Sequence, residues 1–78
     1  MRFNERLKEL RKQSPLMQKE IAEKIGVSTI GFRKYEQGTR EPNIETLLKM
    51  AVLFDVSLDD LLCLDDFKSS HEGFSDEH

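Results

Sequence analysis

The sequence predicts an all-helical fold, and three observations lead to that prediction. Apolar residues recur at helical spacing in successive segments of the 78-residue chain, and no alternation of apolar and polar residues indicates a strand. Glycine, proline and serine stand between these segments, where helices begin and end. With 37% hydrophobic and 35% charged residues, the chain suits one small domain. We expect five helices within residues 1–64, followed by an acidic tail over residues 65–78.

The first two predicted helices are amphipathic. The first covers about residues 3–13 and ends at Ser14-Pro15, because proline cannot continue a helix. Its apolar side chains recur at i, i+4 and i+7: Phe3, Leu7 and Leu10. The second is expected over about residues 16–25. Four of its apolar side chains are expected to share one face: Met17, Ile21, Ala22 and Ile25.

A third helix, about residues 28–37, follows a tight turn. Gly26 can adopt a positive φ just past the second helix, and Ser28 can cap the third by accepting a hydrogen bond from a backbone N–H group. Gly38 ends this helix in the same way as Gly26 ends the second. Two aromatic side chains three residues apart share the face expected to point inward: Phe32 and Tyr35.

The fourth predicted helix runs from an N-cap at Asn43 to about Phe54. Its expected buried face consists of Ile44, Leu47, Leu48, Ala51 and Phe54. After a break, Ser57 and Asp60 have the spacing of a capping box at the start of a short fifth helix. This helix is expected to contribute three leucines to the core: Leu58, Leu61 and Leu62.

The second and third predicted helices, joined across a turn of about three to four residues, match the helix-turn-helix arrangement. The third then presents a cationic outer face and is a candidate reader of the DNA major groove. The net charge of −3 is compatible with DNA binding, because the charge is unevenly distributed along the chain. Residues 1–58 hold eleven Lys and Arg against eight Asp and Glu, a net +3, whereas residues 59–78 hold one against seven, a net −6.

An ordered set of residues runs through the chain: Arg11, Gln18, Ile21-Ala22, Gly26-Val27-Ser28, Tyr35-Glu36, Gly38, Pro42 and Leu47 to Ala51. In order and spacing it resembles the lambda-repressor-like domains of the Xre/Cro family, over about residues 3–62. No single member of the set is specific, but the combination is. The resemblance implies a five-helix DNA-binding domain whose helix-turn-helix is formed by the second and third helices.

The resemblance also implies roles for individual residues. Gln18, at the start of the second helix, is expected to contact a DNA phosphate and to steady the third helix. Outward residues of the third helix and its cap are expected to touch base edges and flanking phosphates: Ser28, Thr29, Ile30, Arg33 and Lys34. Thr39 and Arg40, in the following loop, are expected to contact phosphates. Arg11 and Glu36 are expected to form a structural salt bridge between the first and third helices.

The chain departs from the family pattern at several positions. Met17 stands where an N-cap threonine is usual, which costs about 1 kcal/mol of capping. Phe32 replaces an aliphatic residue, and Arg33 adds charge where serine is frequent. Gly31 lies in mid-helix, where its missing side chain permits either close approach to DNA or close packing on the second helix. Arg33 and Lys34 are alternatively a solvated face with no partner.

A further apolar patch is predicted on the fourth and fifth helices and just after them. Its members are Val52, Leu53, Leu64 and Phe67, with Cys63 nearby. An exposed patch of this kind predicts a homodimer interface, which fits the paired half-sites of an inverted-repeat DNA operator. The alternative is additional core in a small domain.

These observations predict a DNA-binding transcriptional regulator, a phage or bacterial repressor that acts as a homodimer on double-stranded DNA. An enzyme is not expected, because the ordered segments hold no Ser/His/Asp or Cys/His constellation and no glycine-rich phosphate loop. Cys63 is the single cysteine, which excludes an internal disulfide and a multi-cysteine metal site. We expect no cofactor and no bound metal.

No stretch of the sequence is long and apolar enough to span a bilayer, and the first residues lack the apolar segment of a signal peptide. We therefore expect a cytoplasmic protein, nucleoid-associated when bound. The acidic residues 65–78 are expected to form a mobile tail. The tail leaves two alternatives open: a protein-interaction module, such as an antitoxin that masks a toxin, and a segment that competes with DNA by mimicking its charge.

Overall fold

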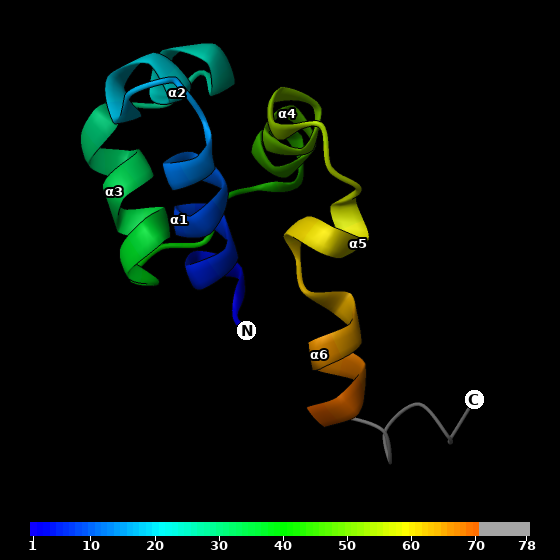
Figure 1. Cartoon of the computed structure of the whole chain (residues 1–78). Helices are drawn as coiled ribbons and strands as arrows, with labels where there is room; N and C mark the ends of the chain where they lie inside the picture. The colour runs from blue at the N-terminus through cyan, green and yellow to red at the C-terminus, as the bar shows by residue number, and fades with distance from the viewer. Residues whose placement is uncertain (71–78) are drawn as a thin grey trace.

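The computed structural model describes residues 1–70, and within that range all regular structure is helical. The elements in chain order are α1 (Phe3–Gln13), α2 (Gln18–Ile25), α3 (Thr29–Gln37), α4 (Ile44–Phe54), α5 (Leu58–Leu61) and α6 (Leu64–Ser70) (Figure 1). The all-helical prediction is confirmed. Within residues 1–70, no helix combines the length and the apolar character that crossing a membrane requires.

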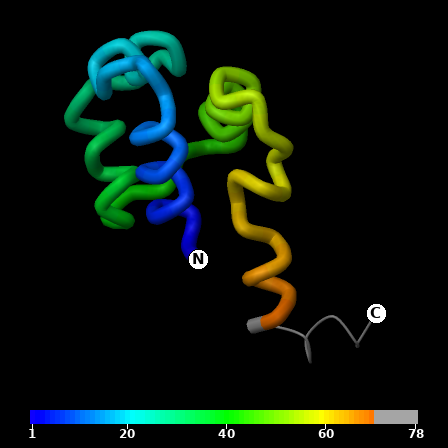
Figure 2. Tube along the Cα trace, in the orientation of Figure 1, coloured from blue at the N-terminus to red at the C-terminus, as the bar shows by residue number. Residues whose placement is uncertain are grey.

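Helices α1 to α5 surround one core, and α6 leads away from it. Helix α3 packs against both α1 and α2, α4 packs against α2, and α5 contacts α1 and α4. Figure 2 traces the chain from α1–α3 on one side to α4 and α5 on the other, with α6 descending beyond α5. This arrangement leaves the outer face of α3 uncovered by any other helix of the described residues.

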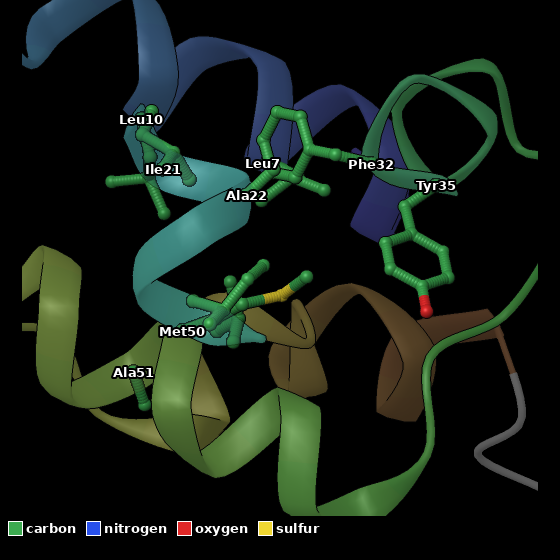
Figure 3. Close-up of a cluster of buried hydrophobic side chains, with 10 residues drawn as sticks. Leu7, Leu10, Ile21, Ala22, Phe32, Tyr35, Met50 and Ala51 are labelled. Carbon is green, nitrogen blue, oxygen red and sulfur yellow. The ribbon is translucent and has the colours of Figure 1, made fainter. Parts of the chain in front are cut away.

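The core is formed by apolar side chains from α1 to α5. Its buried members are Leu7, Leu10, Ile21, Ala22, Ile25, Phe32, Tyr35, Met50, Ala51 and Leu61. Figure 3 shows the ring of Phe32 pointing from α3 into this cluster, and its side chain is 0% exposed. Burying a side chain of this size contributes roughly 1.5–3 kcal/mol relative to leaving it in water. Phe32 and Tyr35 therefore fix which face of α3 points outward.

The start of α2 differs from its prediction. The helix begins at Gln18 rather than near residue 16, and Met17 is its N-cap residue with a side chain 73% exposed. The placement of Met17 on one helical face with Ile21 and Ile25 was wrong, because an N-cap residue has extended backbone geometry and leaves the helical periodicity. The N-cap position that the family resemblance gives Met17 is confirmed. Its own N–H donates to the Glu20 carboxylate at 3.2 Å, but its thioether offers no cap to the first amides of α2.

We expect Met17→Thr to raise the free energy of unfolding by about 0.5–2 kcal/mol, because a hydroxyl at this extended N-cap can accept from an uncapped N–H. In a domain of this size that gain corresponds to a melting temperature several degrees higher. Urea and thermal unfolding measure the effect. Met17→Ala is the matched control, since it removes the exposed side chain without supplying an acceptor. Equal stability of the threonine and alanine variants would contradict the capping argument.

The turn between α2 and α3 follows its prediction. Gly26 has φ +77° and ends α2 in the left-handed conformation, which glycine adopts without a steric penalty. The Ser28 hydroxyl then accepts a hydrogen bond from the Gly31 N–H at 3.0 Å and so caps α3. Gly38, with φ +79°, ends α3 as Gly26 ends α2. Helices α2 and α3 therefore form a helix-turn-helix.

Helix α4 buries a different set of side chains from the one expected. Asn43 caps it, accepting from the Thr46 N–H at 2.8 Å. Thr46, Met50 and Ala51 are buried, whereas Ile44 is 73% and Leu48 50% exposed. The expectation for Ile44 and Leu48 was wrong because α4 is apolar on more than one side. Residue spacing alone could not decide which side faces the core.

Three of the predicted features around α5 and α6 need correction. Leu62 was expected to face the core but is 38% exposed. Ser57 caps α5 through its hydroxyl, which accepts from the Asp60 N–H at 3.1 Å, but the Asp60 carboxylate pairs with Arg6 of α1 at 2.7 Å instead of completing a capping box. Residues 65–70 were expected in a mobile tail but continue as α6. Asp66 on α6 lies 2.8 Å from the α-amino group of Met1. Residues 71–78, the remainder of the predicted tail, lie outside the described residues.

Candidate nucleic-acid interface

The outer face of α3 carries the residues expected to read DNA, and we call it the reading face. Its members are Thr29, Ile30, Arg33 and Lys34. Arg33 and Lys34 are exposed, Ile30 is 66% exposed and Thr29 is half-buried at the start of the helix. The face therefore combines two cations with an apolar side chain and a hydroxyl. Arg and Lys can donate to guanine O6 and N7, while Ile and Thr methyl groups can pack on the thymine methyl. Because Phe32 and Tyr35 are held in the core, this set cannot turn inward.

Arg11 and Glu36 form an ion pair that ties α1 to α3. The Nε atom of Arg11 lies 2.6 Å from Oε2 of Glu36, whose side chain is only 5% exposed. A carboxylate buried to this degree requires a partner, since an isolated buried charge is strongly unfavourable. Asn4 of α1 makes a second link, donating from Nδ2 to the Glu36 backbone carbonyl at 3.4 Å. The base of α3 is thereby fixed against α1.

Gln18 connects this ion pair to the reading face. Its Nε2 donates to Glu36 Oε1 at 3.0 Å, and its Oε1 accepts from Arg33 Nε at 3.2 Å. Four side chains from three helices thus form one continuous series of hydrogen bonds, in the order Arg11, Glu36, Gln18, Arg33. The contact between Gln18 and Arg33 was not foreseen in the sequence. The only available signal was the placement of both residues toward the same DNA surface.

Thr39 and Arg40, in the loop after α3, make different contacts. The Thr39 hydroxyl donates to the Lys34 carbonyl at 3.3 Å, and its N–H donates to the same carbonyl at 3.1 Å, so this residue closes the end of α3. Both Thr39 and Arg40 are exposed. The Arg40 guanidinium returns to the first half of α3, where Nη1 would lie 3.9 Å from a Cβ built on Gly31. Arg40 therefore lies beside the reading face.

Glycine fits position 31 because of the N-cap residue of α3, Ser28, and not because of contact with α2. A Cβ at this position would lie 3.1 Å from the Ser28 hydroxyl oxygen and 3.9 Å from Arg40 Nη1, and no atom of α2 is among its neighbours within 4 Å. Of the two interpretations of Gly31, close packing on α2 is therefore wrong. The missing side chain gives room to the N-cap hydroxyl and to the arginine that lies over it.

Four aspartates near the C-terminal end of the described residues lie on other helices than these cations. Asp59 and Asp60 lie on α5, and Asp65 and Asp66 lie on α6. Figure 1 shows α3 and α6 at opposite edges of the molecule, with α1 between them. Charge is therefore unevenly distributed over the described residues, with these four carboxylates on other elements than the cations of α3. The net negative charge of the chain is thus compatible with a cationic face on α3.

The four residues expected in a dimer interface fall into two places. On α4, Val52 is 81% exposed, whereas Leu53 is half-buried and packs against the core. On α6, Leu64 is half-buried and Phe67 is 53% exposed, near the N-terminal residues. The exposed apolar stripe on α4 is completed by two residues at i−4 and i−8 from Val52: Leu48 and Ile44. A shallow hollow beside Val52 is also lined by Lys24 of α2.

Cys63, between α5 and α6, has an unreactive environment. Burial, together with the nearby carboxylate of Asp66, raises the pKa of its thiol above the ordinary value. A higher pKa lowers the fraction of nucleophilic thiolate at neutral pH. Within residues 1–70, no group of three or more His, Cys, Asp or Glu side chains is arranged to hold a metal ion.

Comparison with known proteins adds to this geometry. Residues 7–61 match the profile of a family described as helix-turn-helix. The chain is 41% identical over 75 residues to the uncharacterized HTH-type transcriptional regulator YqaE of Bacillus subtilis (strain 168), covering 96% of this chain and 62% of that protein. It is 38% identical over 61 residues to the cryptic phage CTXphi transcriptional repressor RstR of Vibrio cholerae serotype O1, covering 78% of this chain and 54% of that protein.

The chain thus spans somewhat more than half of the length of these curated relatives. Among solved structures, it is similar to the P22 c2 repressor protein in a crystal structure with the synthetic operator 9T, with a TM-score of 0.75 and 31% sequence identity. That similarity covers 80% of this chain and 94% of the repressor chain.

Proposed function

The chain belongs to the helix-turn-helix family, and we propose that it is a sequence-specific, double-stranded DNA-binding transcriptional regulator of the repressor type. The observation that carries this proposal is the outer face of α3, where two cations and an exposed apolar side chain are held outward by a helix anchored in the core. The resemblance to the P22 c2 repressor, solved with a synthetic operator, supports it.

In this proposal α3 enters the major groove, which is wide enough to admit a helix and presents a distinct donor and acceptor pattern for each base pair. Lys34 and Arg33 donate to guanine, while Ile30 packs on a thymine methyl group. These contacts supply the sequence preference. These contacts are short-range and depend on the orientation of α3. Because Phe32 fixes that orientation by its burial in the core, it contributes indirectly to the sequence preference.

Phosphate contacts on both sides of α3 position the helix in the groove. Gln18 uses one Nε2 hydrogen on Glu36 and retains a second for a phosphate oxygen. The Ser28 hydroxyl oxygen accepts from Gly31, so its hydrogen remains available as a donor. Arg40 adds a full positive charge from the following loop. Thr39 contributes by closing the end of α3, since its hydroxyl and its N–H both donate to the Lys34 carbonyl.

We expect Lys34→Ala to relax the preference at one base pair and to weaken binding there by about 1–3 kcal/mol.

Arg40→Ala should weaken binding to all duplexes about equally and reduce the slope of log K against log salt by about 1, because one phosphate contact is lost. Fluorescence anisotropy at several salt concentrations measures both. Lys68→Ala on α6 is the control with the same charge change, and it should bind as wild type. Equal behaviour of all three variants would contradict the placement of α3 in the groove.

A homodimer on an inverted repeat completes the proposal. Two copies would place their α3 helices in half-sites about one helical turn apart, roughly 34–36 Å. We place the contact between copies on the exposed apolar side chains of α4, centred on Val52. Phe67 and Leu64 of α6 and Leu53 remain proposed contributors.

If Val52 lies in that contact, Val52→Asp should convert the dimer to monomer, since a buried, unpaired carboxylate is strongly unfavourable. Sedimentation equilibrium without DNA measures the change. Ile30→Asp provides a matched control, because it also places a carboxylate at an exposed apolar position, but on α3. A wild-type and a Val52→Asp protein with the same association state would move the interface away from α4.

A further inference from the structure

The series Arg11, Glu36, Gln18, Arg33 has a fixed direction of hydrogen bonding. Glu36 is buried and pairs with Arg11, so its two carboxylate oxygens act as acceptors: Oε2 receives Arg11 Nε and Oε1 receives Gln18 Nε2. A carboxylate that is ionised cannot donate. Gln18 must therefore turn its NH2 group toward Glu36, because the opposite orientation would place its carbonyl oxygen against a negative charge.

This constraint determines what Gln18 presents to α3. With its NH2 group on Glu36, its Oε1 faces outward and accepts from Arg33 Nε at 3.2 Å. The reversed amide would set two donors, NH2 and guanidinium, against each other. The carboxylate of Glu36 on one side and the guanidinium of Arg33 on the other thus favour the same orientation of the amide. Gln18 is a fixed acceptor at the edge of the reading face.

The contact uses one particular donor of Arg33. Nε is engaged by Gln18, whereas Nη1 and Nη2 make no hydrogen bond or ion pair with a residue in the range 1–70. A guanidinium held at Nε keeps its terminal pair of nitrogens as a planar fork. Such a fork matches O6 and N7 of guanine, which a bidentate arginine contacts in the major groove. The fork is also ordered before binding, so less side-chain freedom is lost when DNA is bound.

We propose that Gln18 is a positioning residue that determines sequence specificity: by holding Arg33 at Nε, it directs the terminal nitrogens of this arginine to a guanine edge. The inference rests on the proposed DNA-binding function and deepens it. It assigns to Gln18 an effect on base choice that is separate from its phosphate contact. It also specifies that Arg33 contacts guanine through Nη1 and Nη2, because Nε is held by Gln18.

The test uses the full chain and a duplex recovered by selection from a random DNA pool. The guanine position that depends on Arg33 is found by comparing selections for wild type and Arg33→Ala. Binding is then measured to that duplex and to the same duplex with this G·C pair changed to A·T. For wild type, the ratio of the two affinities should be roughly tenfold or more.

Gln18→Met preserves length but removes both donor and acceptor, and it should reduce this ratio severalfold. In an Arg33→Ala background, the same substitution should leave the ratio unchanged, since the two residues act through one contact. Gln18→Glu would set a second carboxylate against Glu36 Oε1, so its side chain should leave this place and the ratio should fall as it does in Gln18→Met. Circular dichroism establishes that each variant is folded.

A Gln18→Met protein that binds both duplexes more weakly but with the wild-type ratio would overturn the inference, because Gln18 would then act through phosphate alone. Should Gln18→Met not fold, Arg33→Lys decides: it keeps the charge but lacks the fork, and an unchanged ratio would equally overturn the inference. The absence of any Arg33-dependent guanine in the selected duplex has the same consequence. If no duplex is enriched at all, it is the proposed function that fails.

Discussion

Phe32→Ala should lower the free energy of unfolding by about 3–5 kcal/mol, the range for truncating a buried phenylalanine. The ring is 0% exposed and lies in the cluster that joins α1, α2 and α4 to α3, so its loss leaves a cavity at the centre of the molecule (Figure 3). Small domains have total stabilities of about 5–15 kcal/mol. The variant is therefore expected to be partly unfolded at 37 °C.

Urea denaturation followed by circular dichroism measures this loss. Ile30→Ala is the control on the same helix, because its side chain is 66% exposed and should affect stability by less than about 1 kcal/mol. If Phe32→Ala and Ile30→Ala lowered the free energy of unfolding equally, burial of Phe32 would not be what holds α3 against the core. The outward direction of Arg33 and Lys34 would then need another explanation.

Arg11→Met has the second-largest expected effect, a loss of about 3 kcal/mol. The substitution retains the aliphatic length but leaves the Glu36 carboxylate buried with Gln18 as its remaining side-chain donor. Removing one partner of a buried ion pair typically costs about 3–5 kcal/mol, and Arg11 belongs at the lower end because it is one quarter exposed.

The same unfolding measurement applies, with Lys12→Met as the matched control. Lys12 is the next residue on α1 and is exposed, so its replacement should change the free energy of unfolding by no more than about 0.5 kcal/mol. If Arg11→Met proved as harmless as Lys12→Met, the ion pair would not be what anchors α3 to α1.

Much of the fold follows from local signals in the sequence. The bounds of α1 and α4, the positive φ of Gly26 and the caps at Ser28 and Asn43 are all found where residue type and spacing place them. Each of these features depends on residues within about four positions of one another. Local chemistry is sufficient to specify them.

Apart from Met17, whose misplacement comes from local N-cap geometry, the errors discussed next concern features that depend on distant parts of the chain. Ile44 and Leu48 have helical spacing, but only the packing of α4 against α2 and α5 decides which of its apolar sides is buried. Helix α6 is too short to show a period, and its contact with Met1 joins the two ends of the described chain. Likewise, Gln18 and Arg33 are 15 residues apart and meet only when the turn between α2 and α3 is formed.

The sequence predicted which residues form the reading face better than it predicted the contacts of the residues beside it. Arg33, Lys34 and Ile30 are exposed on α3 as expected from the register that Phe32 and Tyr35 set. The use of the Thr39 hydroxyl to close α3 and the position of Arg40 beside Gly31 required the structure, because both depend on the path of the loop. Which of these residues touch DNA remains a prediction.

Selection of bound duplexes from a random pool, at about physiological salt, tests the central proposal most directly. We predict enrichment of an inverted repeat whose half-sites are about one helical turn apart, with at least one position that loses its preference in Lys34→Ala. Retention of all sequences alike, weak and abolished by moderate salt, would show only non-specific electrostatic binding. That result would contradict a sequence-reading role for α3.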